Sequence, residues 1–213
     1  MDPARISALL RPFLERTLPE VQLQQISTYI DLLLRWNARI NLTAIRDPDE
    51  IVTRHFGESL FLASHLFPGP SSTLAETHVL DIGSGAGFPG IPIKLWAPDL
   101  CLTLVESNHK KAAFLREVIR ALTLTDIDVI TARAETVIPA HPPADVVTLR
   151  AVERFSTILP IAANLVSPSG RLGLLISSAQ LPDIATTLPN LHWEAPIPIP
   201  ESESRVLSIS VPQ

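Results

Sequence analysis

The segment from Val79 to Gly90, VLDIGSGAGFPG, constrains the fold of this chain more than any other part of the sequence. A short apolar strand pattern leads directly into three alternating glycines, and Pro89 is suited to the first turn of a following helix. Glycines are needed where a ligand lies almost on the backbone, because a Cβ atom would block its approach. In open α/β sheets such ligands bind at the carboxyl ends of the strands. The segment therefore predicts a strand, loop and helix that hold a ligand.

The spacing of these glycines narrows the class of ligand. A dinucleotide-binding loop follows the pattern Gly-x-Gly-x-x-Gly, and its third glycine would fall on Phe88 in this chain. Gly83, Gly85 and Gly87 instead follow Gly-x-Gly-x-Gly, the form that S-adenosylmethionine-dependent enzymes use. A purely structural glycine-rich turn is the alternative interpretation of this segment taken alone.

Acidic residues after the next two predicted strands support a nucleoside ligand. Glu106 follows an apolar run and lies 23 residues after Gly83, where a carboxylate can accept both hydroxyls of an adenosine ribose. A solvated glutamate at a strand end is the alternative. Arg133-Ala134-Glu135 follows the third predicted strand, and we expect it within reach of the adenine edge.

The remainder of the chain from residue 77 alternates between strand and helix patterns. The apolar runs are Val79–Ile82, Cys101–Val105, Ile127–Ile130, Asp145–Leu149 and Leu172–Ile176, with helical stretches at His109–Leu122 and Phe155–Val166 between them. This alternation predicts a Rossmann-like α/β sheet, mostly parallel, with right-handed crossovers. Two extended segments, Leu191–Pro200 and Arg205–Val211, predict a C-terminal antiparallel hairpin.

The first third of the chain has a different pattern. Apolar residues between Leu23 and Leu34 recur at the three-four spacing of one helix face. We therefore expect an N-terminal helical extension over residues 1–66, a loop at Phe67–Ser72, and a methyltransferase-type core over residues 77–213. A length of 213 residues fits one α/β domain with such an appendage.

Composition and missing motifs exclude several other classes of protein. A hydrophobic fraction of 46% supports a sizeable core and argues against disorder. The single cysteine, Cys101, excludes a disulfide framework and a four-cysteine zinc site, and we expect it to be a small buried hydrophobic residue. The sequence has neither a secretory signal nor 18 consecutive apolar residues, so we expect a cytoplasmic protein with no membrane span and no metal.

The missing motifs also bear on the methyl acceptor. An Asn-Pro-Pro-Tyr-like sequence, which would hold an exocyclic amino group, does not follow the fourth predicted strand. Cys101 is not placed to attack carbon six of a pyrimidine. A ring nitrogen such as guanine N7 fits these absences, because its free lone pair attacks the sulfonium methyl in line without losing a proton. The cofactor carries the chemistry, and aligning the two groups supplies roughly 7–11 kcal/mol of barrier reduction.

Four segments of the chain resemble one known family. They are Trp36–Ile45 (WNARINLTAI), Arg54–Leu60 (RHFGESL), Val79–Pro92 (VLDIGSGAGFPGIP) and Val105–Val118 (VESNHKKAAFLREV). These segments resemble the GidB/RsmG family of bacterial small-subunit (16S) ribosomal RNA guanine-N7 methyltransferases, over about residues 20–178. The resemblance implies methyl transfer from S-adenosylmethionine to a guanine of 16S rRNA, with ribosomal RNA or the small subunit as partner.

The resemblance also implies cofactor contacts, at Gly83, Phe88, Ala134, Glu135 and Arg150. Gly85, Gly87 and Glu106 join this set from the glycine-loop argument above. Arg150 at the end of the fourth predicted strand is a positioning candidate, and no residue is a certain catalytic group. Its cation could orient the methionine carboxylate, a nearby carboxylate or an RNA phosphate, and the sequence leaves these three alternatives open.

The chain departs from the family pattern at three places. The family usually has aspartate at Glu58, serine at Leu149 and Lys-Gly at Ser177-Ser178. If that lysine contacts RNA in relatives, another cation must do so here. The candidates are three residues of one basic helical stretch: Lys110, Lys111 and Arg116. A solvated helix face is the alternative, and the formal net charge of −5 permits only a local basic patch.

Several further interpretations stay open in the sequence. Asn37 and Asn41 could share one helix face, or could bond the chain that follows the helix. Arg54 and His55 either line the site or play a structural part, and we expect the three tryptophans in the core. A small-molecule methyltransferase, a nicotinamide-dependent dehydrogenase and a non-catalytic nucleotide-binding module are the competing functions. We expect a monomer.

Overall fold

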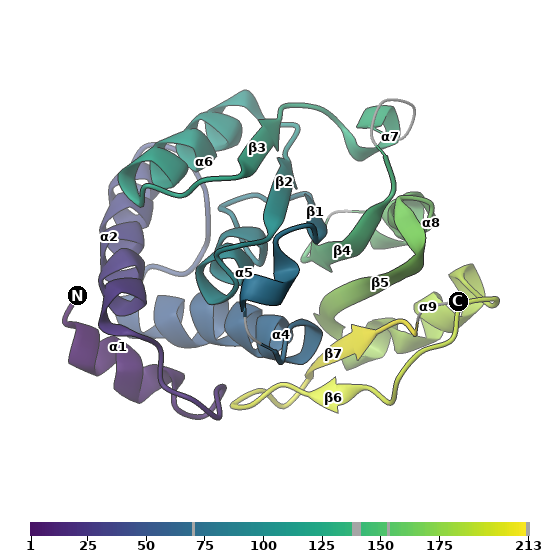
Figure 1. Ribbon diagram of the computed structural model, residues 1–213, viewed down its shortest axis with the longest axis horizontal. Helices are drawn as coiled ribbons and strands as arrows, with labels where there is room; N and C mark the ends of the chain where they lie inside the picture. The colour runs from purple at the N-terminus through teal and green to yellow at the C-terminus, as the bar shows by residue number, and fades with distance from the viewer. Residues whose placement is uncertain (70, 138–141, 153, 212–213) are drawn as a thin grey trace.

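The computed structural model describes residues 1–69, 71–137, 142–152 and 154–211, and its centre is a seven-stranded sheet (Figure 1). The described strands lie in the order β3-β2-β1-β4-β5-β7-β6. They are β1 His78–Ile82, β2 Cys101–Val105, β3 Ile127–Ile130, β4 Ala144–Arg150, β5 Val166–Ser177, β6 Ile197–Pro198 and β7 Arg205–Ile209. The first five strands pair in parallel, and β7 pairs antiparallel with β5 and β6. The predicted sheet and its C-terminal hairpin are confirmed.

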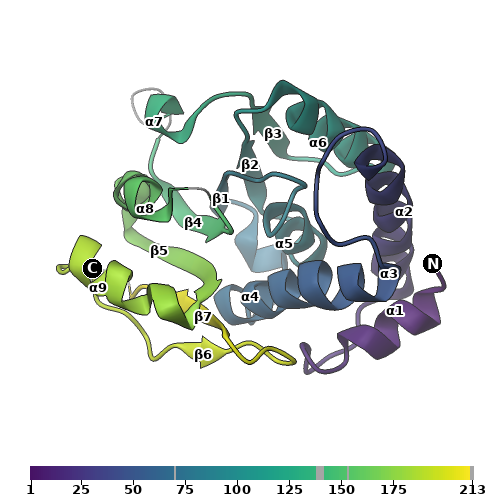
Figure 2. The same ribbon diagram turned by 180° about the vertical axis from the view of Figure 1, so that it is seen from behind.

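Helices cover both faces of this sheet. They are α1 Pro3–Leu10, α2 Glu20–Asn37, α3 Pro48–Glu50, the π-helix η1 Ile51–Gly57, α4 Glu58–Leu66, the 3₁₀ turn η2 Ser71–Leu74, α5 Gly90–Trp96, α6 His109–Ala121, α7 Ala134–Val137, α8 Phe155–Ala163, the 3₁₀ turn η3 Ser178–Gln180 and α9 Leu181–Thr187. Figure 2 shows α4 lying along the sheet between α1 and β7. No helix of the described residues is long and apolar enough to cross a membrane.

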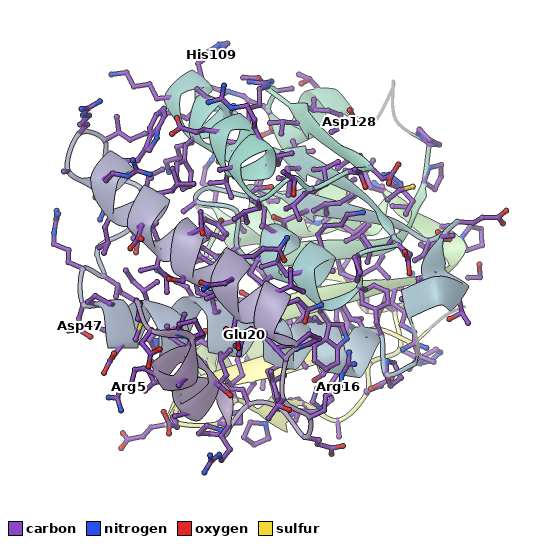
Figure 3. The ribbon with its side chains drawn as sticks, turned by 60° about the vertical axis from the view of Figure 1, so that its left-hand side comes forward. Arg5, Arg16, Glu20, Asp47, His109 and Asp128 are labelled. Carbon is purple, nitrogen blue, oxygen red and sulfur yellow. The ribbon has the colours of Figure 1, made fainter. Side chains whose placement is uncertain are left out.

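Alternation along the strands divides the core into two clusters. Neighbouring residues of one strand point to opposite faces, so Val79 belongs to one cluster and Leu80 to the other. The first cluster lies beneath α2, α4, α5 and α6, and the second beneath α8 and α9. The outer sides of α1 and α6 carry polar residues that project from the molecule, such as Arg5 and His109 in Figure 3. The sheet is thus the middle of three layers.

The N-terminal helices share their core with the sheet. The first cluster joins Ile26, Phe56 and Leu60 of the N-terminal segment to Val79 and Leu104 of the strands. The expected boundary at residues 67–72 includes Pro70, which lies outside the described residues, and the division into an extension and a core stays a prediction. The packing means that the N-terminal helices form part of one continuous layer over the sheet.

The register of the strands brings the predicted site residues to one edge. Ile82, the last residue of β1, pairs with Val105 on one side and Leu149 on the other. The next residues are held there too, because the Gly83 amide donates to Val105 O at 2.9 Å and the Glu106 amide to Ile130 O at 3.0 Å. Strand β2 follows β1 in the chain and lies on one side of it, whereas β4 lies on the other side. Parallel sheets bind ligands at the strand ends where the strand order switches in this way.

One predicted helix boundary is wrong. The predicted helix Phe155–Val166 ends at Ala163, and Val166 instead begins β5 by pairing with Ala144. The ladder between β4 and β5 then shifts in register before Val146 pairs with Arg171. An apolar helix end followed directly by an apolar strand start looks continuous in sequence, so periodicity could not separate them.

The structure decides one open alternative and corrects one expectation. Asn41 does not share a helix face with Asn37, because α2 ends at Asn37. The Asn37 side chain instead accepts from the amides of Leu42 and Thr43, at 2.9 and 3.1 Å, and so bonds the chain that follows the helix. Cys101 is only half-buried, because it is the first residue of β2.

Candidate active site

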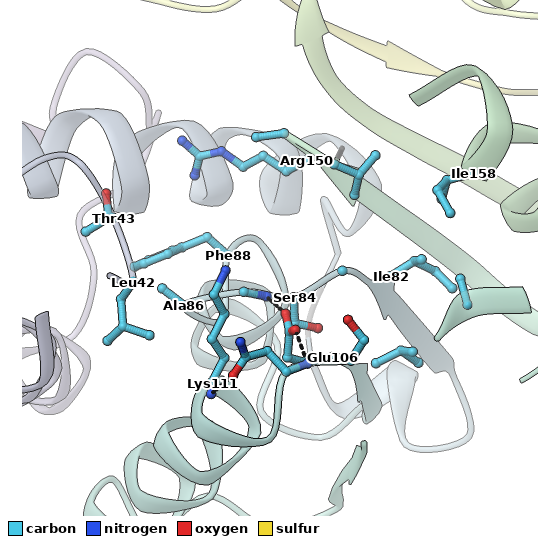
Figure 4. Close-up of a pocket in the computed structure, with 18 of the residues that line it drawn as sticks. Leu42, Thr43, Ile82, Ser84, Ala86, Phe88, Glu106, Lys111, Arg150 and Ile158 are labelled. Carbon is cyan, nitrogen blue, oxygen red and sulfur yellow. Dashed lines mark hydrogen bonds between the residues drawn. The ribbon is translucent and has the colours of Figure 1, made fainter. Parts of the chain in front are cut away.

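A cavity of about 670 Å³ opens at the carboxyl ends of the parallel strands. Two groups of residues line it, from opposite sides (Figure 4). One group follows the strands and includes Ile82–Ala86, Phe88, Val105–Asn108, Ala132–Glu135 and Arg150–Val152, with Lys111, Arg154 and Ile158 from the helical regions beside them. The other group comes from the N-terminal segment: Leu42, Thr43, Ile45, Arg54 and His55. We call these the strand-end wall and the N-terminal wall.

The glycine loop leaves room for a ligand against its backbone. Gly83 and Gly85 have φ values of +71° and +57°, a conformation that side chains rarely adopt. A Cβ atom on Gly85 would meet only Gly83 O, at 3.7 Å, so this position faces open space. Gly87 is not among the lining residues, and a Cβ atom there would overlap Tyr29 and Ile91. Its role in this structure is close packing behind the loop.

Glu106 is held rigidly at the floor of the cavity. Its side chain accepts from the Gly85 amide through Oε2 at 2.9 Å and from the Asn108 amide through Oε1 at 2.7 Å. Each carboxylate oxygen has a second lone pair, so both can still accept from the two hydroxyls of a ribose. The open space over Gly85 and this fixed carboxylate fit the nucleoside part of S-adenosylmethionine.

A buried ion network stands behind the N-terminal wall. Glu58, 1% exposed, accepts from Arg54 at 3.1 Å, from Arg150 at 3.1 Å and from Arg205 Nε at 2.7 Å. Arg150 also donates to Ser59 Oγ and His55 O, each at 3.2 Å, and to Arg54 O. Three guanidinium groups from η1, β4 and β7 therefore meet at one carboxylate.

This network bears on the alternatives left open for Arg150. The structure pairs its guanidinium with a nearby carboxylate, Glu58, which was one of the three. Burial lowers the pKa of Arg150, while Glu58 opposes that shift. The position of the family's Lys-Gly is occupied by Ser177, whose partner across the strand pair is Arg205. The C-terminal hairpin thus contributes a cation to the same network.

Aromatic rings connect the two walls. His55 stacks on Phe88 at 4.8 Å and 19°, and the other stacking partner of Phe88 is Tyr29 at 5.3 Å and 4°. The Tyr29 hydroxyl donates to Ala86 O in the glycine loop, and the Arg150 guanidinium lies 6.0 Å from the centre of the Phe88 ring. The sequence flagged His55 without choosing its role, and gave no signal for Tyr29, which looks like an ordinary core position in its helix.

Two groups at or near the cavity, the half-buried His55 and the buried Asp81, have strongly shifted pKa values. Burial, followed by the charges of Arg150 and Arg54, lowers the pKa of His55 to about 3. Burial raises the pKa of Asp81 to about 6, against the effect of hydrogen bonds from Thr148 and Ser84 and from the Gly90 amide. Asp81 lies in β1 and was not singled out in the sequence.

The predicted RNA contacts separate into three kinds. Lys111 lines the cavity, and Figure 4 shows it extending from α6 toward Phe88. Lys110 is exposed outside the cavity lining. Arg116 donates to Val129 O and Thr131 Oγ1, both at 2.9 Å, and so braces the end of β3. The lining includes further cations that were not candidates for RNA, Arg133 and Arg154.

The strand order and the cavity at the carboxyl ends of the strands are those of a Rossmann-like α/β fold. In agreement, a "SAM dependent methyltransferase" from Aquifex aeolicus superposes with a TM-score of 0.61 at 11% identity, over 78% of this chain and 94% of that one. The sequence profile of GidB, "rRNA small subunit methyltransferase G", matches residues 22–190. The chain belongs to the GidB family, as the sequence resemblance predicted.

Curated relatives agree with this assignment. "Ribosomal RNA small subunit methyltransferase G" of Roseiflexus sp. (strain RS-1) is 48% identical over 158 residues, which are 73% of this chain and 65% of that protein. The protein of the same name from Chloroflexus aggregans is 40% identical over 202 residues, or 90% of this chain and 82% of the relative. The chain thus spans slightly less than two thirds of the Roseiflexus protein.

Proposed function

We propose that this chain transfers a methyl group from S-adenosylmethionine to N7 of a guanine in 16S ribosomal RNA, acting as a monomer in the cytoplasm. The names of its relatives support the substrate. The observation that most supports an RNA substrate is the charge of the cavity. Five cations line the cavity against two carboxylates, in a chain whose net charge is −5. Such a local excess of cations suits a phosphate-rich ligand.

On this proposal the strand-end wall holds the cofactor. S-adenosylmethionine, when bound, supplies an electrophilic methyl group on a sulfonium sulfur. Gly83 and Gly85 would lie against it, Glu106 would accept from the ribose hydroxyls, and Ala134 and Glu135 would border the adenine. Phe88 and Arg150, which the family resemblance implies, lie where this wall meets the N-terminal wall.

The protein residues then align the acceptor and need not remove a proton. The titratable side chains that line the cavity include His55, whose pKa of about 3 leaves it neutral near pH 7. Asp81, the buried acid with a raised pKa, is bonded to Thr148 and is not among the lining residues. This arrangement suits a ring nitrogen that attacks with a free lone pair, and it supports guanine N7 over acceptors that must lose a proton.

A small-molecule methyltransferase is the alternative function. The experiment that separates the two is labelled methyl transfer from S-adenosylmethionine to ribosomal RNA from cells lacking this enzyme. Free 16S rRNA and intact small subunits are offered in parallel, and the product is mapped by cleavage selective for N7-methylguanine. One labelled guanine at a single position is the expected result. Cofactor binding without transfer to either form of RNA would overturn the RNA assignment.

A further inference from the structure

The two halves of the glycine loop are bonded differently. The amides of Gly83 and Ser84 donate to Val105 O at the end of β2, at 2.9 and 3.0 Å. The amides of Gly87 and Phe88 instead donate to Ser84 O inside the loop, at 2.6 and 3.2 Å. These bonds tie the first half of the loop to the sheet. The second half, residues 86–88, depends on contacts from other elements for its position.

Tyr29 of α2 supplies such a contact through its hydroxyl. The residue is fully buried, and its hydroxyl donates to Ala86 O, which lies 57 residues later in the chain. A Cβ atom on Gly87 would overlap this hydroxyl, so the loop passes directly over it. Burial raises the pKa of Tyr29 and the charge of Asp81 adds to the shift, so the hydroxyl keeps the proton that it donates.

The Tyr29 ring also restrains the Phe88 side chain. The two rings stack with their centroids 5.3 Å apart and their planes within 4° of each other. Phe56 of η1 packs perpendicular to both rings, with its centroid 5.2 Å from Tyr29 and 5.1 Å from Phe88. All three residues are buried, and of the three only Phe88 lines the cavity. Phe88 is therefore held from behind by rings that no ligand in the cavity replaces.

We propose that Tyr29 is a positioning residue, which holds residues 86–88 of the glycine loop in the conformation that binds S-adenosylmethionine. Ala86 and Phe88 line the cavity, whereas Tyr29 is not among the lining residues and acts through them. The inference rests on the proposed placement of the cofactor against the strand-end wall. A loop that is ordered beforehand loses little conformational entropy when its ligand arrives. Loss of the anchor therefore weakens binding although every ligand contact is still present.

A purely structural role makes a different prediction. Buried aromatic residues stabilise any core in which they pack. If Tyr29 did only this, its substitution would lower the free energy of unfolding and leave the affinity of the folded protein unchanged. If Tyr29 positions the loop, the affinity of the folded protein falls as well. Cofactor affinity, measured far below the unfolding transition, separates the two roles.

Three variants test the proposal by calorimetric titration with S-adenosylmethionine. Tyr29→Phe removes only the hydroxyl, and we expect the dissociation constant to rise about 5- to 10-fold, the scale of one hydrogen bond. Tyr29→Leu also removes the stacked ring, and we expect a rise of about 50-fold or more. Ile26→Val is the matched control, because Ile26 is fully buried on the same helix and lies outside the cavity lining. Its constant should stay within twofold of wild type.

Urea denaturation and circular dichroism of the same proteins complete the test. We expect Tyr29→Phe and Ile26→Val to stay folded, and only Tyr29→Phe to bind the cofactor more weakly. An affinity of Tyr29→Phe within twofold of wild type would overturn the proposal, whatever its loss of stability. Equal weakening in Ile26→Val would also overturn it, because affinity would then simply follow stability.

The proposed function is tested separately in the same preparations. Labelled methyl transfer to ribosomal RNA is measured with the wild-type protein alone. A wild-type protein that binds S-adenosylmethionine but methylates no ribosomal RNA would count against the proposed function. The titrations would still decide the role of Tyr29, because they require the cofactor and no RNA.

Discussion

The two walls of the cavity are stabilised in different ways. The strand-end wall is built from the loops that follow four parallel strands, and its central acid, Glu106, is held by the backbone amides of Gly85 and Asn108. The N-terminal wall depends on side chains that are distant in sequence, since Glu58 pairs with Arg150 and Arg205 from the sheet. The acid of one wall is held by main-chain amides, and the acid behind the other is held by charged side chains.

This difference indicates which property of the protein a substitution in each wall should change. A loop that is held by main-chain hydrogen bonds keeps its shape when one side chain changes. A buried network of charges is destabilised as a whole when its buried acid is removed, because the remaining buried cations lose their compensation. Changes in the strand-end wall should therefore affect ligand affinity, whereas changes behind the N-terminal wall should affect folding.

The largest expected effect is that of Glu58→Gln. This substitution leaves Arg150 buried without a countercharge, and we expect the free energy of unfolding to fall by about 3–5 kcal/mol. Urea denaturation measures it. The matched control is Asp49→Asn, which breaks an exposed pair with Arg5 and should leave the free energy of unfolding nearly unchanged, because solvent screens exposed charges. Equal losses in the two variants would contradict the importance of the buried network.

Glu106→Ala tests the strand-end wall by affinity. The variant loses the acceptor for a ribose, and we expect the dissociation constant for S-adenosylmethionine to rise about 10- to 100-fold, equivalent to roughly 1.4–2.8 kcal/mol. Calorimetric titration gives the constant, and Glu76→Ala, exposed outside the cavity, serves as the control. An unchanged affinity would mean that the ribose does not bind at Glu106.

The pH dependence of stability compares one group from each part of the site. His55 has a folded-state pKa of about 3, below its usual 6.5, so the unfolded chain binds the proton first and stability falls as pH drops below 6.5. Asp81 has a folded-state pKa of about 6, above its usual 3.8, so the native protein binds the proton first and stability rises as pH drops from 6 to 4. Between pH 6 and 4 the two contributions oppose each other.

Variants separate these opposing contributions. Relative to wild type, His55→Phe should gain up to about 1.4 kcal/mol of unfolding free energy per pH unit as pH falls from 6 to 4.5. Asp81→Asn should lose a similar amount per unit over the same range. Urea denaturation at several pH values measures both slopes. Parallel curves for all three proteins would show that neither group titrates as the burial of the site predicts.

The smallest expected effect concerns the cations at the cavity. Lys111→Ala should weaken binding to single-stranded RNA by a few-fold and reduce the slope of log K against log salt by about 0.7, the value for one phosphate contact. Lys110→Ala is the matched control on the same helix, because Lys110 is outside the cavity lining. Equal slopes in the two variants would indicate that the basic helix is only a solvated face.

Several features of this protein were determined by the sequence alone. The glycine spacing, the position of Glu106 and the alternation of strands and helices gave the fold class, the ligand edge of the sheet and the family, because each is a local pattern with a local physical cause. The boundary between α8 and β5 was misplaced, because the two apolar segments adjoin and no clear turn signal separates them in the sequence. The packing of Gly87 against Tyr29 was not indicated by the glycine spacing.

Only the tertiary structure decided the N-terminal wall. Nothing in the neighbourhood of Glu58 in the sequence indicates that Arg205, 147 residues later, donates to it, or that Tyr29, Phe88 and His55 form one stack. Lys111 and Arg116 look equivalent on one helix until the fold turns one toward the cavity and the other toward β3. Burial, charge pairing and pKa depend on which distant residues meet, and that is fixed only when the chain packs.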